Sequence, residues 1–420
     1  MGESSRSWSS LWNLAKIPPY LWTVFGLILG ITLGAWFPDT LAPLASLGTR
    51  AVQVFVLAAP LLILVALAPA IARLCRTGRA SQLAARVLSW YLLTSLAAGL
   101  LALCFSALLF NLPLANSESG MLADAWHLVR TTWTRADAPW PVLALVFACI
   151  AGIAGAKWDP VFRVLESSYT LFLASMKGLY YVIVPFVFCL GISIGTRFGV
   201  SIGMATYLEL SLYTAFLCLL WSSIYVFVIL RWIGGVPSYQ VIYRYYLPVA
   251  VVAAGTCSSI ATLPFNLDAC RRYGVAPEVR NFVIPFGSVV NMDASVIAYI
   301  AYAPFVLTRV FDYPLSWTVL LFAWPVIVVF TISAPGLPAG MGTALWSATL
   351  FASLLGLQGE EKLVFIETWI ALCGGVPDMI RTATNCTSDG FTAILFNRCD
   401  PELSPAATAV EIPLEGEVNA

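Results

Sequence analysis

Long apolar runs separated by more polar connections occupy most of the first 233 residues of the chain. Each run approaches or exceeds the roughly 20 residues that a helix needs to cross the hydrocarbon core of a bilayer. The first run is longer than a signal-peptide core, so we expect it to stay in the mature protein. The pattern predicts membrane helices at residues 17–37, 50–74, 83–110, 140–156, 166–197 and 203–233.

The pattern changes after residue 235, where small residues, hydroxyls and prolines interrupt the apolar segments. Residues 240–274 are broken by GTCSSIATLP, and residues 314–354 are broken by TISAPGLPAGMG. Proline disrupts a helix, and non-helical backbone at membrane depth survives only where protein or a water-filled cavity covers it. We therefore predict two re-entrant hairpins, each followed by a helix with polar residues, at about 278–309 and 360–398. Such paired segments indicate a secondary transporter, with two kinked spanning helices of a channel or membrane enzyme as the alternative.

Composition strengthens the membrane interpretation and removes several other classes of function. Of the 420 residues, 60% are hydrophobic and only 10% are charged, whereas soluble domains contain about 25% charged residues. The formal net charge of +0 gives no basic footprint for nucleic acid. His127 is the only histidine and no cysteines form a CxxC pair, which argues against a histidine-based metal centre, a Ser-His catalytic centre and a zinc site.

Basic residues indicate the orientation of the chain. Positive residues concentrate on the cytoplasmic side of membrane proteins, and the connection between the second and third predicted helices carries Arg73, Arg76, Arg79 and Arg86. We therefore expect this connection and the N-terminus to be cytoplasmic. The connection at 111–139 would face outward, and the acidic residues 399–420 would form a cytoplasmic tail.

One polar stripe lies in the apolar C-terminal part of the chain. At about 100° per residue, five side chains of PDMIRTATNCTSDG fall within roughly 100° of arc on one helix face: Asp378, Arg381, Thr382, Asn385 and Asp389. Charges at membrane depth are costly and face a bundle interior or a cavity, so a binding site is one interpretation. The other is a buried network in which Asp378 and Arg381 pair with each other and hold helices together.

Two more groups of polar residues bear on a cation site. Asn291 and Asp293 lie on opposite sides of an ideal helix, so they reach one site only where the helix unwinds. Pro285 and Gly287 just upstream favour such unwinding, and carbonyl, carboxylate and hydroxyl oxygens are the ligands of hard cations. Another helix face carries three hydroxyl groups, which taken alone are more typical of helix packing: Tyr91, Thr94 and Ser95.

Four motifs in order resemble the dicarboxylate/amino acid:cation symporter family, which includes aspartate and excitatory amino-acid transporters. They are SSIATLP (258–264), NMDAS (291–295), APGLPAG (334–340) and DMIRTATNCTSD (378–389). The resemblance covers most of the chain and is strongest from about residue 255 to 398. It implies an all-α polytopic membrane protein of eight transmembrane helices and two re-entrant hairpins, with inverted repeats, assembled as a homotrimer in the cell membrane.

The resemblance also implies an elevator mechanism, in which one domain slides across the bilayer against a static scaffold. The scaffold would comprise helices 1 and 2 (residues 1–74) and helices 4 and 5 (140–197). The transport domain would comprise helix 3 (83–110) and residues 203–398, which contain helix 6, both hairpins and helices 7 and 8. The second hairpin would act as the gate.

The resemblance assigns substrate-binding roles to several of these residues. Arg381 would hold the side-chain carboxylate of an acidic amino acid, because its planar fork suits bidentate binding. Asp378 would accept the α-ammonium group. The other substrate contacts would come from Thr382, Asn385, Ser295 and the backbones around Ser258, Ser259, Pro335 and Gly336.

Up to three co-transported sodium ions are also implied. One would bind at Gly287, Asn291, Asn385 and Asp389. A second would bind at Tyr91, Thr94, Ser95, Asn291 and Asp293. A third would bind carbonyl groups near Val289 and of Thr331, Ile332 and Ala334, beneath the gate.

Several positions depart from the family pattern, mostly in the substrate pocket. Gly374 stands where the family usually has an acid, so Arg381 would lose an orienting partner, and Pro377 is expected to break the helix before Asp378. Ile260 replaces the third serine of the first hairpin. The smaller changes are Ala294 and Ser388 for glycine, Ala334 for a hydroxyl residue, and Cys257 and Met379 where some relatives place arginine.

Our leading hypothesis is a sodium-coupled importer of aspartate or glutamate, and not an enzyme. Within the same fold, Gly374 and Ile260 leave open proton coupling or a neutral substrate such as serine or cystine. A membrane hydrolase is disfavoured because the lone histidine lies in a loop, so no pair of nucleophile and base can be named. Saturable counterflow of labelled substrate would argue against a channel.

Overall fold

The computed structural model describes residues 19–76, 81–115, 120, 123, 126, 130, 140–332 and 341–399. Within these ranges the chain forms helices and no strand, which confirms the all-α prediction. The first half contains α1 (Pro19–Trp36), α2 (Pro38–Arg76), α3 (Ser81–Leu109), α5 (Trp140–Lys157), α6 (Asp159–Ile224) and the π-helical η3 (Tyr225–Ile233). The second half contains α7 (Ser238–Val241), η4 (Ile242–Tyr246), α8 (Leu247–Thr256), α9 (Ser259–Tyr273), α10 (Pro277–Val290), α11 (Asp293–Pro304), η5 (Phe305–Val310), α12 (Trp317–Ile332), α13 (Met341–Leu355), α14 (Gly359–Cys373) and α15 (Val376–Cys399).

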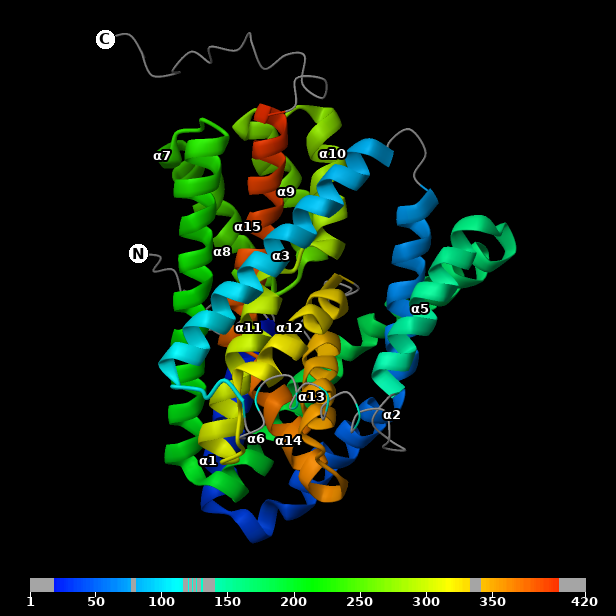
Figure 1. Cartoon of the computed structure of the whole chain (residues 1–420). Helices are drawn as coiled ribbons and strands as arrows, with labels where there is room; N and C mark the ends of the chain where they lie inside the picture. Colours follow the sequence, from blue (N-terminus) through cyan, green and yellow to red (C-terminus); the bar gives the residue numbers. More distant parts are fainter. Residues whose placement is uncertain are drawn as a thin grey trace, which may run out of the picture.

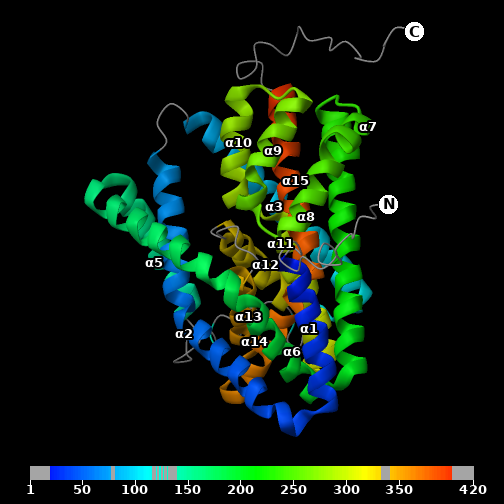
Figure 2. The same ribbon diagram turned by 180° about the vertical axis from the view of Figure 1, so that it is seen from behind.

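The helices pack around α11, whose 12 residues are all buried. α3 crosses obliquely and contacts both α11 and α12 (Figure 1). α8, α9, α10 and α15 gather at the end of the molecule away from the α1–α2 connection, and α2 and α5 lie side by side along one edge (Figures 1 and 2). The polar segments predicted from the sequence therefore lie inside the helix bundle, while the apolar α2 and α5 lie at its margin.

Three helical stretches of the described chain are long and apolar enough to cross a membrane: residues 85–109, 204–233 and 277–310. α14 and α15 would form a fourth span together, although they are bent by 63° at the break between them. Several other apolar helices are shorter, including those at 317–331 and 343–355. The chain is thus a multi-pass membrane protein, and the number of eight spans stays a prediction.

α6 and η3 together cover two of the predicted helices, those at 166–197 and 203–233. The two are separated by a single residue with non-helical backbone, Gly199, which has φ 72° and ψ 175°. A positive φ of this size is readily adopted only by glycine. The chain therefore changes direction at Gly199 without a longer loop.

The first interrupted segment forms two short helices in contact, α8 and α9. Cys257 between them has φ 48°, in the left-handed region, and the Ser258 side chain caps α9 by accepting from the Ala261 N–H at 3.3 Å. Such a cap satisfies a backbone donor that the helix start leaves unpaired. In the second interrupted segment α12 and α13 are likewise in contact, and residues 333–340 between them lie outside the described residues.

The NMDAS motif lies at a helix break. α10 ends at Val290, Asn291 adopts an extended conformation with φ −90° and ψ 103°, and α11 begins at Asp293. The unwinding that the sequence required for Asn291 and Asp293 to reach one site is therefore present. It allows the two side chains to leave the backbone in directions that a continuous helix would forbid.

A second break divides the segment predicted as one helix at 360–398. It falls at Gly374 and Gly375, where Gly375 has φ 70°, and not at Pro377, which sits in the first turn of α15. Proline is tolerated in a first turn because its missing N–H would have no helical partner there. The Tyr207 hydroxyl bridges the break, donating to the Gly374 carbonyl at 3.1 Å and accepting from the Val376 N–H at 2.9 Å.

Glycines allow α1 and α6 to pack backbone to backbone. A Cβ built on Gly30 would lie 2.4 Å from the Phe188 carbonyl oxygen, and one on Gly34 would lie 2.3 Å from that of Ile192. On the facing helix, a Cβ on Gly195 would lie 2.1 Å from the Ile31 carbonyl oxygen. Small residues four apart commonly permit such close crossing in membrane helices.

We expect Gly34→Ala to lower the thermal unfolding temperature of the detergent-purified protein, because the new methyl group must push the two helices apart. Overpacking of this kind costs about 1–3 kcal/mol. Gly26→Ala is the matched control, since its Cβ would lie 3.5 Å from the Val184 carbonyl oxygen, an ordinary contact. Equal unfolding temperatures for the two variants would contradict the close packing.

Candidate substrate and cation site

The predicted site residues converge where the α10–α11 break meets α3 and α15. α10 and α11 each contact both α3 and α15, and α15 runs beside α11 (Figures 1 and 2). The polar side chains brought there are all buried: Tyr91, Thr94, Ser95, Asn291, Asp293, Ser295, Asp378, Arg381, Thr382, Asn385 and Asp389. None of these side chains faces lipid.

Arg381 is held by acceptors on three sides. Its Nη2 donates to Asp378 Oδ1 at 2.7 Å and its Nη1 donates to the Tyr299 hydroxyl at 2.5 Å, while the guanidinium lies 5.1 Å from the Tyr299 ring centroid. Its Nε has no hydrogen-bond partner among the described residues. The guanidinium is only 2% exposed, so its charge is desolvated and has donor capacity left for an acceptor.

The absence of an acid at position 374 is partly compensated by the backbone. The Gly374–Gly375 break leaves the Cys373 carbonyl without a helical partner, and Arg381 Nη2 donates to it at 3.2 Å. The last carbonyls of a helix have no intrahelical donor. The Cys373 carbonyl oxygen thus contacts Arg381 in place of the acidic side chain that the family usually has at position 374.

Asp293 collects donors from two other helices. Ser95 Oγ donates to its Oδ1 at 2.7 Å and Thr94 Oγ1 donates to the same oxygen at 3.2 Å. The indole Nε1 of Trp221 on α6 donates to its Oδ2 at 3.1 Å. The Tyr91 hydroxyl, on the same face of α3, donates to the Val283 carbonyl at 3.1 Å. Two of the three α3 hydroxyls are therefore directed at a carboxylate, and the third reaches a backbone carbonyl.

A second set of oxygens surrounds Gly287. Asn291 Nδ2 donates to Asp389 Oδ1 at 2.9 Å and to Ser388 Oγ at 2.7 Å, and its Oδ1 has no partner in the described part of the chain. A Cβ on Gly287 would lie 2.5 Å from both Asp389 Oδ1 and the Tyr91 hydroxyl. A lone buried amide oxygen, a carboxylate and a phenol around a glycine form an oxygen-only donor set of the kind hard cations prefer.

Asn385 links α15 to the NMDAS motif. Its Oδ1 accepts from the Ala294 N–H at 2.9 Å, and its Nδ2 donates to Ser295 Oγ at 3.2 Å and to the Met292 sulfur at 3.3 Å. The Asn385 side chain therefore contacts Ser295, a predicted substrate residue, and also Met292 and Ala294 on either side of Asp293.

The hairpin residues are placed only in part. Ser258 and Ser259 lie at the α8–α9 junction and are buried, and the Cys386 thiol of α15 lies against Ser259. Pro335, Gly336 and Ala334 lie outside the described residues. Thr331 lies on α12 and Val289 on α10, and these two helices are in contact. The side chain of Ile332 lies outside the described part of the structure. All three sodium sites stay predictions.

Two aromatic residues of the site carried no signal that sequence reasoning singled out. Trp221 and Tyr299 lie in apolar runs, where an aromatic residue is more often core packing. Only their polar tips, directed at Asp293 and Arg381, distinguish them. Within the described residues no three histidine, cysteine or acidic side chains cluster as a metal site, so any cation here would depend on mixed oxygen ligands.

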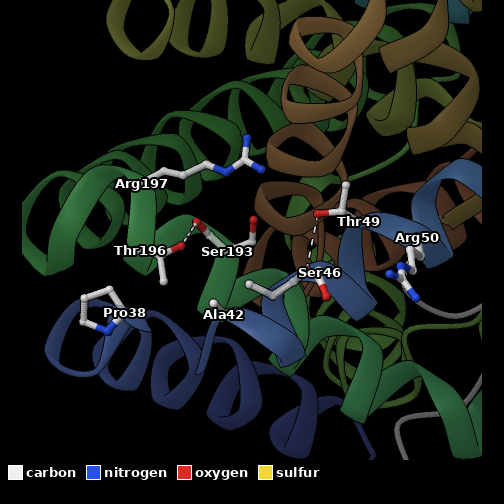
Figure 3. Close-up of a pocket in the computed structure, with 9 residues that line it drawn as sticks. Pro38, Ala42, Ser46, Thr49, Arg50, Ser193, Thr196 and Arg197 are labelled. Atoms are coloured by element: carbon white, nitrogen blue, oxygen red, sulfur yellow. Dashed lines mark hydrogen bonds between the residues drawn. The ribbon is translucent and has the colours of Figure 1, made fainter. Parts of the chain in front are cut away.

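A cavity of about 410 Å³ lies elsewhere, between α2 and α6 (Figure 3). None of the predicted site residues lines it. Its walls are formed by Pro38, Ala42, Ala45, Ser46, Thr49, Arg50, Ser193, Thr196 and Arg197. The buried Glu367 of α14 lies against this wall, accepting from Thr49 Oγ1 at 3.0 Å.

Comparison with known proteins identifies relatives along nearly the whole chain. It is 26% identical over 317 residues to the proton/sodium-glutamate symport protein of Bacillus subtilis, with 73% of this chain and 70% of the relative covered. It is 23% identical to the serine/threonine transporter SstT of Bifidobacterium adolescentis, with 87% and 86% covered. It is 21% identical to the C4-dicarboxylate transport protein of Burkholderia mallei, with 96% of each covered.

The family profile described as the sodium:dicarboxylate symporter family matches residues 20–128 and 139–399. The match confirms the resemblance seen in the four motifs, and its members are transporters, as expected of a chain that is not an enzyme. With a matching profile over most of its length, this chain belongs to the sodium:dicarboxylate symporter family.

Proposed function

We propose that this chain is a sodium-coupled symporter that imports an acidic amino acid, aspartate or glutamate. The observation that carries the proposal is the buried Arg381 beside Asp378, with a free donor at Nε among the described residues. A substrate carboxylate matches the guanidinium fork, and its ammonium group matches the neighbouring carboxylate. Thr382, Ser295 and Asn385 would complete the pocket.

Sodium coupling is supported by the oxygen groups next to this pocket. Asp293 with Thr94 and Ser95, and Asp389 with Asn291, are buried acids that have hydroxyl or amide partners but no buried cationic partner in the described hydrogen bonds. A bound cation would neutralise them, and discontinuous helices with unwound backbone are where transporters bind their coupling ions. Asn385 contacts Ser295 of the proposed pocket and the backbone of Ala294 next to Asp293, so one side chain would couple substrate binding to cation binding.

A neutral amino acid is the second candidate, and one observation favours it. Asp378 already neutralises Arg381 in this structure, at 2.7 Å. If that pair stays intact, the pocket carries no net charge toward the substrate side chain. Relatives named for serine and threonine, for glutamate with protons or sodium, and for C4-dicarboxylates all have comparable identity.

The family's elevator motion, trimer and cell-membrane location are part of the proposal. α14, in the part expected to move, packs on α2, in the part expected to stay fixed, and on α6, which has residues in both parts. Their polar contact is centred on Glu367, which accepts from Thr49 and lies 3.8 Å from Arg197 beside the cavity of Figure 3. Sliding would break this polar contact together with the packing of α14 on α2. Cytoplasmic N- and C-termini follow from the distribution of arginines.

Uptake by purified protein in proteoliposomes tests the function directly. We expect an inward sodium gradient, at equal pH on both sides, to drive saturable accumulation of labelled aspartate or glutamate. A pH gradient alone, without sodium, is expected to drive none. Labelled serine and succinate, offered under the same gradients, are the controls for a neutral substrate and for a plain dicarboxylate.

The outcomes separate the candidates. Sodium-driven serine uptake with no aspartate uptake would replace the acidic substrate with a neutral one. Accumulation under the pH gradient alone would replace sodium with protons. Downhill flux of substrate without counterflow would point to a channel.

A further inference from the structure

The Asp293 carboxylate is fixed from two opposite directions. Oδ1 faces the hydroxyls of Thr94 and Ser95 on α3, and Oδ2 accepts from the Trp221 indole on α6. Asp293 itself is 0% exposed and starts α11. One carboxylate thus connects three helices, and its two oxygens have different kinds of partner.

The two kinds of partner differ in what they can do for a cation. A hydroxyl is a donor and an acceptor, so Thr94 and Ser95 can turn and offer lone pairs to an ion at Oδ1. The indole N–H is a donor only, so Trp221 can never be a ligand. Its hydrogen bond can only hold Oδ2 in place.

The Trp221 indole is buried and packs against Tyr225. Trp221 is 4% exposed and packs edge-on against Tyr225, with ring centroids 6.1 Å apart. The Tyr225 hydroxyl accepts from Trp90 Nε1 of α3 at 2.6 Å and lies 2.8 Å from Thr392 Oγ1 of α15. Through Tyr225, the Trp221 side chain is therefore connected to α3 and α15, the helices that carry Thr94 and Asp389.

We propose that Trp221 is a positioning residue for cation selection: it fixes Asp293 Oδ2 and so leaves Oδ1 alone directed at the α3 hydroxyls. This inference rests on the proposed sodium-coupled function and adds a residue that contacts neither ion nor substrate. With one oxygen presented, the site fits a small ion between Oδ1 and the hydroxyls. Without the indole donor, the carboxylate is free to rotate and offer both oxygens, which suits larger ions and discriminates less.

The test compares Trp221→Phe with the matched control Trp369→Phe. Trp369 is also buried, and its indole donates to Ser347 Oγ at 3.0 Å, away from the cation oxygens. Hydrogen bonds to charged groups are the stronger ones, so we expect the sodium concentration for half-maximal substrate binding to rise roughly tenfold or more in Trp221→Phe. Sodium over potassium discrimination should fall as well. The substrate Kd at saturating sodium should stay within about twofold of the wild-type value on the same scale.

A donor-retaining variant separates positioning from packing. Trp221→His keeps a ring N–H and should recover most of the sodium response lost in Trp221→Phe, and it also serves if Trp221→Phe fails to fold. Trp369→Phe should leave the sodium response unchanged.

Three results would overturn the inference. One is an unchanged sodium response in Trp221→Phe. Another is an equal weakening of sodium response and of substrate Kd at saturating sodium, which would indicate a structural role. The third is a wild-type protein that binds substrate without any sodium dependence, which would overturn the proposed function and the inference together.

Discussion

Replacing Arg381 by alanine should abolish uptake of aspartate and glutamate by the reconstituted protein. The guanidinium is buried, so a substrate carboxylate entering the pocket of the variant would be desolvated without a cationic partner. Truncating one partner of a buried, hydrogen-bonded charge pair at a binding interface costs about 2–5 kcal/mol, which corresponds to roughly a thirtyfold or greater loss of affinity. Isothermal binding titration with aspartate, in saturating sodium, measures the effect.

The design must separate substrate binding from folding, because Arg381→Ala also leaves Asp378 without its partner. The double variant Asp378→Ala/Arg381→Ala removes both charges and should fold, yet should still fail to bind aspartate. Arg309→Ala is the control for loss of an arginine, since Arg309 pairs with Glu209 at an exposed position. Aspartate binding within about twofold of the wild-type value in the double variant would refute the substrate assignment.

Asp389→Asn should remove most of the sodium dependence of substrate binding. The substitution keeps the shape of the side chain and an oxygen near Gly287, but it removes the negative charge that would neutralise a cation in this buried region. The Asn291 amide donates to Asp389, and a neutral amide accepts that bond less strongly. We expect the half-saturating sodium concentration to rise by roughly tenfold or more, measured by titrating sodium at fixed aspartate.

Two further variants locate the effect. Gly287→Ala would place a methyl group 2.5 Å from Asp389 Oδ1 and the Tyr91 hydroxyl, and should weaken the sodium response without changing any charge. Asp268→Asn is the control, because Asp268 pairs with Arg271 and Arg272 in an exposed position. A normal sodium response in both Asp389→Asn and Gly287→Ala would show that the cation binds elsewhere.

The helix breaks show how far local sequence determined this fold. Pro285 and Gly287 ahead of NMDAS predicted the unwinding observed at Asn291, and the small residues around Cys257 predicted the α8–α9 break. Both signals act through the backbone, within one or two turns of the residues that carry them. The C-terminal break was predicted at Pro377 and occurs at Gly374–Gly375, because proline fits a first turn and glycine adopts the positive φ that the break requires.

For the site, the sequence identified the residues but the tertiary structure determined their contacts. The sequence identified the charged and amide residues because polar groups in apolar runs are conspicuous, and it kept two interpretations of Asp378 and Arg381. The structure contains the ion pair that one of them describes, and it also surrounds Arg381 with Tyr299 and the Cys373 carbonyl. A backbone carbonyl carries no residue-type signal, so sequence reasoning could not have found it.

By itself the sequence determined that this is an apolar, helical membrane protein with interrupted segments, and it placed the site residues on those segments. Hydropathy and backbone propensity act over a few neighbouring residues, so they are readable from the chain. Only the tertiary structure decided which groups meet. Thr94 and Asp293 are 199 residues apart and Trp221 and Asp293 are 72 apart, yet they are in hydrogen-bond contact. Such contacts depend on how whole helices cross, as at the glycines of α1 and α6, and crossing is set by packing between elements, which no local pattern records.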